Sequence, residues 1–403
     1  MTVQEHQKAE TRVAPFGATA TVIAVTAIVV LSQLYGAIPL FAPVQESFDF
    51  AGGAVAWVQT SFGIAYAAGF IAWGPAVDRF GLRRVMLVGL CALSVATVAT
   101  SVAPTASWFL TGRAVQGALA ASFAPAAFAY LGARPARARR AVSITVLTSS
   151  FLASAVIGQV AAQVATERLD WPWFFWLGAA ALALSAFAVR AVLLPDIPSS
   201  QTANNPARIL GRLLRRVPVI VLLVATVLVL GPMIALYTAI GAAAVTDSSE
   251  LLLLRASALP ALVWAPFGTR WLSRVSPPRR LTGAFIMAGI AAAAVALVPD
   301  NVIGTGIAMF GVAAAVAVAA PAMIQTLAGH APESQGSATA LYTCFLFFGA
   351  SIAPAIVTTT AASVPSTAVT SGLMSVAAAA LVILSRTHPI QTSSRRSRKE
   401  SSS

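Results

Sequence analysis

Acidic residues, lysines, histidines and cysteines are all scarce in this chain of 403 residues. Only 10% of its residues are charged, whereas a soluble domain carries about 25%. The three histidines lie outside the long apolar runs, so we expect no metal site within them. The two cysteines lie inside these runs, which does not favour a disulfide framework. The runs contain no paired carboxylates and no nucleophile with a neighbouring base, so the sequence predicts neither an enzyme nor a cofactor.

Apolar residues, by contrast, make up 58% of the chain, and the mean hydropathy is +0.81. One core cannot bury so much apolar surface, and a membrane-spanning helix needs only about 20 such residues. Helix is the expected state because backbone groups in lipid must be satisfied within each segment. The sequence therefore predicts an all-α membrane protein with twelve transmembrane helices, at 17–41, 54–77, 85–103, 107–131, 142–165, 171–194, 217–241, 251–273, 281–299, 302–327, 336–360 and 365–385.

Basic and acidic residues alternate along the predicted loops. Arginines near a membrane helix mark the cytoplasmic side, so the alternation predicts that both termini are cytoplasmic in a multi-pass protein of the cytoplasmic (inner) cell membrane. The net charge of +13 is then explained by contact with an anionic inner leaflet, and no nucleic acid is expected as a partner. We expect Trp57, Trp108, Trp171 and Trp173 near the outer helix ends. The basic stretches are 79–84, 134–140, 208–216, 270–280 and the tail; the acids between them include Glu46, Asp49, Asp170, Asp247 and Asp300.

A polar loop at 195–216 divides the predicted helices into two sets of six. The expected domains are a cytoplasmic segment (1–16), an N-terminal six-helix bundle (17–194), the central loop, a C-terminal six-helix bundle (217–385) and a disordered basic tail (386–403). The basic stretch 207–216 either lies on the inner leaflet or is a solvated linker. The first apolar run is too long for the core of a signal peptide, so no cleaved leader is expected.

Charge and glycine are concentrated between the second and third predicted helices, where residues 74–84 read GPAVDRFGLRR. This pattern resembles the loop signature of the major facilitator superfamily of secondary transporters. The resemblance implies a latch, in which Asp78 docks on the start of the eleventh helix and the arginines bridge to neighbouring helices. The alternative is that the arginines only mark topology. The matching positions are Gly74, Asp78, Arg79, Gly81, Arg83 and Arg84.

Arg113 lies well inside the fourth apolar run, with Gln116 and Gly117 on the same helix face. An arginine at mid-membrane costs about 2.5–3.5 kcal/mol, so it needs a watery cavity or a partner. The spacing resembles the fourth-helix motif of the same superfamily, whose arginine is implicated in substrate or proton coupling. The alternative is a structural arginine held by main-chain carbonyls.

Further candidates come from the helices that line the pore in this superfamily, the first, fourth, seventh and tenth. Arg255, near the start of the eighth helix, is expected to reach outward to water, with attraction of an anion as the alternative. In the fifth helix, small residues at four-residue spacing predict close helix packing. The pore candidates are Gln33, Tyr35, Met233, Tyr237, Met309 and Phe310; the small residues are Ser150, Ser154, Gly158 and Ala162.

The resemblance covers the whole chain and implies two pseudo-symmetric six-helix bundles that work by alternating access. It is closest to bacterial efflux-type members, which predicts a monomer that exports a drug or metabolite, with proton coupling left open. The alternatives are uptake or exchange of a small anionic solute bound through Arg113, and a membrane sensor of the same fold that does not transport. No Asp or Glu falls inside a predicted helix, which favours a neutral or anionic solute over a cation.

Overall fold

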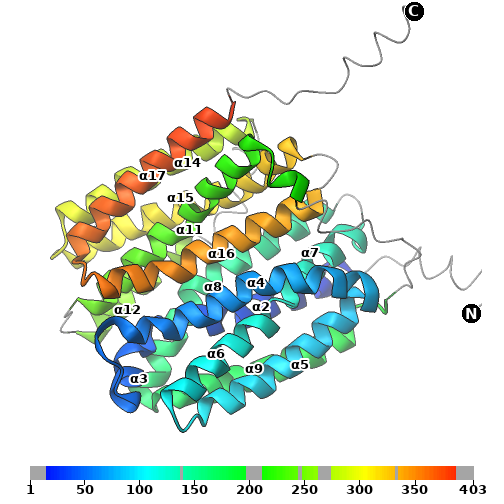
Figure 1. Cartoon of the computed structure of the whole chain (residues 1–403), viewed down its shortest axis with the longest axis horizontal. Helices are drawn as coiled ribbons and strands as arrows, with labels where there is room; N and C mark the ends of the chain where they lie inside the picture. The colour runs from blue at the N-terminus through cyan, green and yellow to red at the C-terminus, as the bar shows by residue number, and fades with distance from the viewer. Residues whose placement is uncertain are drawn as a thin grey trace, which may run out of the picture.

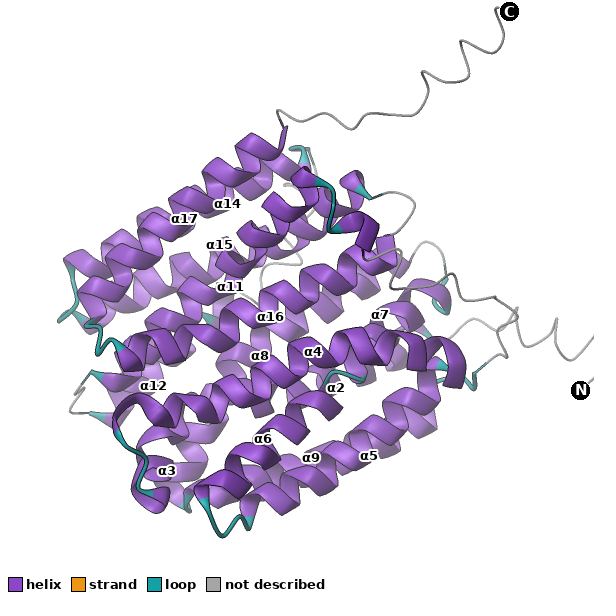
Figure 2. Ribbon diagram, viewed as in Figure 1, coloured by secondary structure: helices purple, strands orange, loops and turns teal. Residues whose placement is uncertain are grey.

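The computed structural model describes residues 15–136, 139–196, 211–243, 247–261, 274–331 and 335–386. Within these ranges the chain is helical and has no strand (Figure 2). The long helices run roughly side by side (Figure 1). Ten helical segments are long and apolar enough to cross a membrane. Helix α4 (Trp57–Phe80) is not one of these ten segments, but its 24 residues make about 36 Å of helix, and it packs against α6 and α16.

Each of the twelve predicted helices coincides with a helix of the described chain. For the predicted eighth helix, residues 262–273 lie outside the described ranges. The first group contains α2 (Phe16–Tyr35), α4, α5 (Leu82–Ser101), α6 (Ala106–Ala120), α7 (Phe123–Ala133), α8 (Arg140–Arg168) and α9 (Trp171–Val192), with η1 (Ile38–Leu40), α3 (Phe41–Phe48) and η2 (Gly52–Ala56) between α2 and α4. The second contains α11 (Val217–Ala242), α12 (Ser248–Ala256), α14 (Pro277–Leu297), α15 (Val302–His330), α16 (Gln335–Thr359) and α17 (Val364–Arg386).

Two predicted helices are interrupted in the structure, and a proline accounts for each interruption. The first ends at Tyr35 and continues as η1 and α3, because Pro39 has no N–H to donate to the carbonyl of Tyr35 and its ring crowds that carbonyl. The fourth is split into α6 and α7. Pro125 likewise has no N–H to donate to the carbonyl of Ala121, the first residue between the two helices.

The two groups use the same pattern of helix packing. In the first, α2 packs on α8, α5 on α9 and α5 on α6. In the second, the corresponding helices pair as α11 with α16, α14 with α17 and α14 with α15. This agreement is the internal symmetry expected of a repeat transporter. The groups meet mainly where α4 packs on α16.

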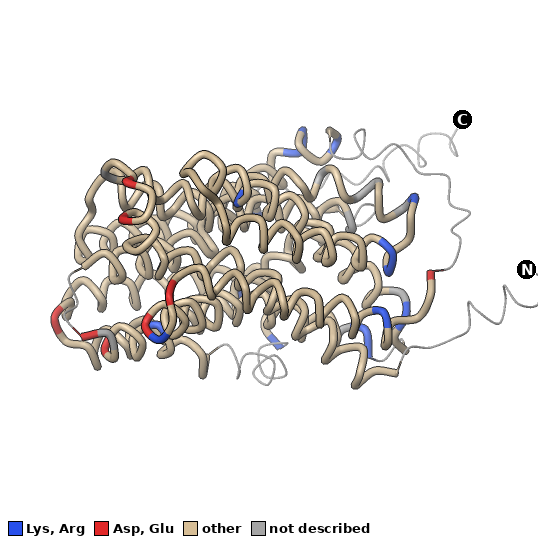
Figure 3. Tube along the Cα trace, turned by 90° about the horizontal axis from the view of Figure 1, so that it is seen from below, with Lys and Arg blue, Asp and Glu red and all other residues tan. Residues whose placement is uncertain are grey.

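Charges separate along the helix direction. Acidic residues gather at one end of the helices and most arginines at the other (Figure 3); we call these the acidic end and the arginine end. The first and last described helices both have an end at the arginine end. There the Arg139 guanidinium carbon lies 4.8 Å from the ring centre of Phe16, and Arg386 donates to Thr282 (2.9 Å). The predicted alternation of charge is therefore present in the fold.

The tryptophans expected near the outer ends lie close to the acidic end, and one of them is buried. Trp57, Trp108 and Trp173 are exposed, as side chains at a membrane interface should be. Trp171 is only 8% exposed, because its ring packs 5.5 Å from Phe109 and its indole N–H donates to Ser47 (3.0 Å). It is a core residue of the first group.

Candidate functional site

Arg113 is fully buried, and its guanidinium joins three helices. Its Nε donates to the Val58 carbonyl of α4 (3.0 Å), and its Nη2 donates to the Gln33 carbonyl of α2 (2.8 Å). The Gln33 carbonyl lies in the last turn of α2. In a regular helix it would accept from the N–H of Ala37, but that N–H donates to the Leu34 carbonyl instead. A helix leaves such carbonyls unpaired, and a cation there is favoured by the helix dipole. The arginine thus caps α2.

Gln116 extends this arrangement to a further helix. Its side-chain oxygen accepts from Arg113 Nη1 (2.8 Å), and its amide donates to Thr97 of α5 (2.8 Å). The guanidinium carbon also lies 4.6 Å from the ring centre of Phe62 and 5.7 Å from that of Phe175. Cation–π contact of this kind stabilises a desolvated arginine. The geometry corresponds to the alternative interpretation, a structural arginine held by carbonyls and rings.

The other candidates near Arg113 serve packing. A Cβ on Gly117 would lie 2.8 Å from the main-chain carbon of Phe62, so α6 and α4 cross in close contact. The Gln33 side chain turns toward α9, where a Cβ on Gly178 would lie 2.9 Å from its Cδ. Gly158 is equally close to Ser32 Cα, at 2.8 Å. The close packing predicted for the fifth helix is therefore confirmed at Gly158.

The expectation that Arg255 reaches outward is wrong. Its side chain is 3% exposed and donates to Gln163 of α8, whose amide donates to Glu167 (2.7 Å). Tyr237 donates to the Arg255 carbonyl (3.3 Å). Arg255 lies only two turns from the helix start, but α8 of the first group covers it, and this cover is not visible in local sequence. Two candidates, Arg255 and Tyr237, are brought together here.

Hydrogen bonds between the two groups occur near the acidic end. The Gln59 amide donates to the Ala350 carbonyl (3.2 Å), and Thr60 donates to the Ser351 carbonyl (2.9 Å). A Cβ on Gly63, one turn further along α4, would overlap the side chain of Ser351. The Arg255–Gln163 bond joins the groups at the same end. The groups are thus closed against each other on the acidic side.

An aromatic column continues from Arg113 to the boundary between the groups. The ring centre of Phe62 is 6.0 Å from that of Tyr66, which lies 4.8 Å from that of Phe347 on α16. Tyr35, the candidate at the end of α2, is fully buried beside this column, with Tyr66 and Tyr342 near its side chain. Sequence reasoning missed Phe62, Tyr66 and Phe347, although an aromatic recurs at each fourth position from Phe62 to Phe70.

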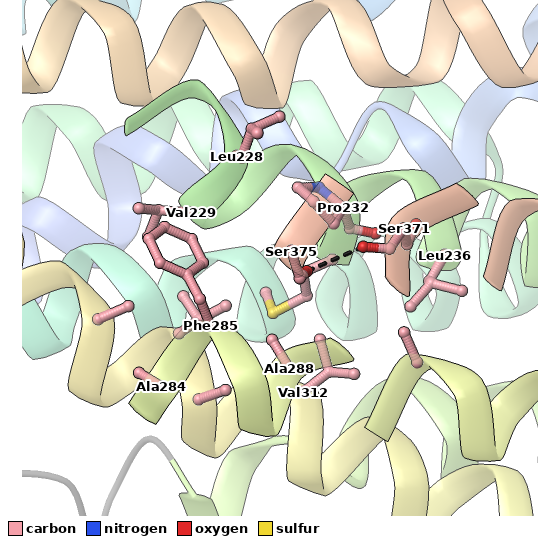
Figure 4. Close-up of a pocket in the computed structure, with 15 residues that line it drawn as sticks. Leu228, Val229, Pro232, Leu236, Ala284, Phe285, Ala288, Val312, Ser371 and Ser375 are labelled. Carbon is pink, nitrogen blue, oxygen red and sulfur yellow. Dashed lines mark hydrogen bonds between the residues drawn. The ribbon is translucent and has the colours of Figure 1, made fainter. Parts of the chain in front are cut away.

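The remaining pore candidates lie apart from this column. Met233 lines a small pocket inside the second group, between α11, α14, α15 and α17 (Figure 4). Ser371 donates to the Pro232 carbonyl in that pocket (3.4 Å). Met309 is buried in the core, whereas Phe310 is 42% exposed. The structure therefore does not gather the predicted pore candidates into one cavity.

The loop between α4 and α5 is anchored by a residue that sequence reasoning missed. Asp196, just beyond α9, accepts from the backbone N–H groups of Arg83 (2.8 Å) and Arg84 (3.0 Å). It therefore caps the start of α5. Gly81 turns the chain there with φ of +94°, and a Cβ would meet Asp196, so both conformation and space require glycine. The Arg83 side chain donates to the Arg190 carbonyl of α9.

The predicted latch is only partly described. Arg83 bridges to a neighbouring helix, as expected, but this helix belongs to its own group. Arg79 is exposed, with its guanidinium carbon 5.2 Å from the ring centre of Phe80. Gly74 and Asp78 lie in α4, and Asp78 is close to its arginine-end terminus. The side chain of Asp78, and the side chains at the start of α16, are outside the described part. Docking of Asp78 on α16 stays a prediction.

Replacing Asp196 with asparagine should weaken the cap on α5, because a neutral side chain is a poorer acceptor at a helix N-terminus. We expect a loss of about 0.5–1 kcal/mol for asparagine and about 1 kcal/mol or more for alanine. Thermal unfolding of the purified protein measures whether the melting temperature falls from wild type to Asp196→Asn to Asp196→Ala. Asp300→Asn, at an exposed site, is the control. Equal melting temperatures for Asp196→Ala and wild type would contradict the assignment.

Two helix groups that share one packing pattern and close against each other at one end are the architecture of secondary transporters. The class is thus an α-helical, multi-pass membrane protein. The chain belongs to the Major Facilitator Superfamily, whose family model matches residues 23–354.

Similarity to individual proteins covers only part of the chain. The puromycin resistance protein pur8 of Streptomyces alboniger is 31% identical over 142 residues, which is 34% of this chain and 27% of that protein. The lincomycin resistance protein of Streptomyces lincolnensis is 28% identical over 171 residues, 42% of this chain and 35% of that protein. The multidrug transporter mfsC of Aspergillus fumigatus is 28% identical over 192 residues, 45% and 36% of the two chains. The alignments thus span 27% to 36% of the length of these relatives.

Proposed function

We propose that this protein is a secondary active exporter of small drug-like or metabolite molecules across the cytoplasmic membrane. The observation that carries the proposal is the contact between the groups. Each group is tied internally, the first by the Arg113 hydrogen bonds, while the contacts Gln59–Ala350 and Thr60–Ser351 join the groups near the acidic end. Two rigid bodies joined at one end are what alternating access requires.

Orientation follows from charge. The arginine end faces the cytoplasm because positive loops are retained on that side, and the anionic inner leaflet attracts them further. The described contacts then close the outer side. A solute would enter from the cytoplasm or the inner leaflet, and the groups would rock apart at the acidic end to release it outside. We propose that the protein acts as a monomer, and coupling to protons is tested below.

The alternative function, uptake or exchange of an anion through Arg113, has less support. The Nε, Nη1 and Nη2 atoms of Arg113 already donate to Val58, Gln116 and Gln33. An anion would have to break bonds that join α2, α4 and α6. A sensor of the same fold differs from an exporter in one measurable quantity, the flux of solute.

The test is flux in proteoliposomes. Puromycin and lincomycin, named in two relatives, are the first probes, with chloramphenicol, tetraphenylphosphonium and cefoxitin as uncharged, cationic and anionic members of the panel. Accumulation is measured with and without a pH gradient. Acceleration by the gradient indicates proton coupling, whereas binding of a probe without flux indicates a sensor. Neither binding nor flux for any probe would contradict the exporter proposal.

Substitution of Gly63 by alanine should open the outer side. The added methyl group would overlap Ser351 Oγ and Cβ, so α4 and α16 must separate near the acidic end. We expect the distance between spin labels at Glu46 and Asp300, exposed sites in different groups, to lengthen by several ångströms, on the scale of a repacked helix contact. Pulsed electron resonance measures it, with Cys91 and Cys344 replaced by serine.

Ser351→Gly provides the matched control for this prediction. It removes the overlapping atoms and leaves the Ser351 Cα at 3.3 Å from the new methyl group, which is a tight but tolerable contact. The double variant should therefore recover the wild-type distance distribution. A long distance that persists in the double variant would show that the Gly63–Ser351 contact does not hold the outer side closed.

A further inference from the structure

Three of the five tyrosines in the chain meet at the boundary between the two groups. Tyr35 ends α2, Tyr66 lies in α4 and Tyr342 lies in α16. Tyr66 and Tyr342 both lie near the Tyr35 side chain, and Tyr66 packs across the boundary on Phe347 of α16, with ring centres 4.8 Å apart. We call these three residues the tyrosine cluster. Two of its members move with the first group and one with the second, so rocking of the groups must change its geometry.

The hydroxyls of the cluster are buried without hydrogen-bond partners. Tyr35 and Tyr66 are fully buried and Tyr342 is 3% exposed. None of their hydroxyl groups has a partner within the residues that the structure describes. Such a group is costly, and a buried polar group without a partner in a native protein requires an explanation. The three hydroxyls lie in one region, so a single hydrogen-bonding molecule can explain them together.

The backbone beside the cluster is also of the kind found at transporter binding sites. Helix α2 stops at Tyr35 and continues as the short η1. Broken helices in membrane proteins occur where backbone lines a cavity or is covered by protein, and they form the substrate sites of many transporters. Two observations, the partnerless hydroxyls and the helix break, thus coincide at Tyr35.

Charge and ring chemistry limit what this site can accept. Phe347 and Phe70 flank Tyr66, with ring centres 4.8 and 4.9 Å from that of Tyr66, which provides apolar walls. No acid lies inside the predicted helices to pair with a cation. Arg113, which lies over Phe62 of the same aromatic column, has its Nε, Nη1 and Nη2 bonded to protein oxygens, so it does not offer a free anion site.

We infer that Tyr35, Tyr66 and Tyr342 form the recognition site for an uncharged amphipathic solute, to which their hydroxyls hydrogen-bond while the phenylalanine rings cover its apolar part. This inference rests on the proposed export function and names its substrate class. In the described conformation the cluster is closed. Separation of α16 from α4 carries Tyr342 away from Tyr35 and Tyr66, which opens the site and breaks the solute's hydrogen bonds as it is released.

The test uses Tyr→Phe variants at each position, which remove only the hydroxyl. With chloramphenicol as the uncharged probe, we expect KM for proteoliposome flux to rise roughly tenfold per variant, the effect of one hydrogen bond lost inside a protein. The melting temperature without solute should stay equal or rise, since each variant removes a partnerless hydroxyl. A purely structural role would instead lower the melting temperature and leave KM unchanged.

Tyr130→Phe is the matched control, because the Tyr130 hydroxyl accepts from Leu194 N (2.8 Å) near the arginine end. It should lower the melting temperature and leave KM unchanged. Flux of chloramphenicol with wild-type KM in all three cluster variants would overturn the inference, and so would flux restricted to tetraphenylphosphonium or cefoxitin. Absence of flux and binding for every probe would instead contradict the export function itself, so the two failures are distinguishable.

Discussion

Replacement of Arg113 by lysine is expected to destabilise the protein at least as much as replacement by methionine. Lysine keeps the buried charge but cannot reproduce the planar fork that reaches Val58, Gln33 and Gln116 together. It also loses the stacking on Phe62. Methionine leaves the same acceptors without donors but removes the cost of burying a charge. We expect losses of roughly 3 kcal/mol or more, from acceptors worth about 1–3 kcal/mol each.

Thermal unfolding in detergent measures the melting temperatures. We expect the wild type to melt highest, Arg113→Met lower, and Arg113→Lys at or below Arg113→Met. Arg279→Lys, at an exposed position on α14, is the control and should melt like wild type. A water-facing coupling arginine behaves differently, because lysine would then preserve its charge and the melting temperature. Wild-type stability of Arg113→Lys together with altered coupling to the pH gradient would restore the coupling role that the sequence motif implied.

Gly117→Val is expected to abolish stable folding of the first group. The nearest atoms to an added Cβ are the main-chain O, C and Cα of Phe62, and main chain within α4 cannot turn aside as a side chain can. Helices α4 and α6 would have to separate, which also stretches the Arg113–Val58 bond one turn away. Overpacking of this kind typically costs about 1–3 kcal/mol, and loss of the bonds to Arg113 adds to it.

Gly132→Ala is the contrasting variant, because no atom lies within 4 Å of its added Cβ. Alanine should be neutral or slightly stabilising there, since it favours helix by up to about 1 kcal/mol over glycine. The monodisperse fraction in size-exclusion chromatography and the melting temperature distinguish the two. Equal yields and melting temperatures for Gly117→Val and wild type would show that α4 and α6 are not packed as described.

Arg113 and Arg255 show what sequence reasoning can supply about single residues. Both arginines could be identified as unusual from their apolar surroundings. For Arg113 the sequence left two interpretations open. The hydrogen bonds to Val58 and Gln33 favour the structural one, while the coupling role stays a prediction. For Arg255 depth along the helix predicted an outward side chain, but α8 covers it through Gln163. The number of turns to the helix end can be counted in the local sequence, whereas the identity of the helix that packs over a residue cannot.

The sequence by itself determined the helices, their order, the separation of charge between the two ends and the family. These follow from local rules, since a backbone in lipid must form helix and arginines stay on one side. Only the tertiary structure decided which residues face one another: the Arg113 bonds, the Asp196 cap, the Gly63–Ser351 contact and the tyrosine cluster. In water the polar face of a helix marks its exposed side. In a membrane the lipid is as apolar as the core, so sequence polarity does not distinguish the face that packs on other helices from the face that meets lipid.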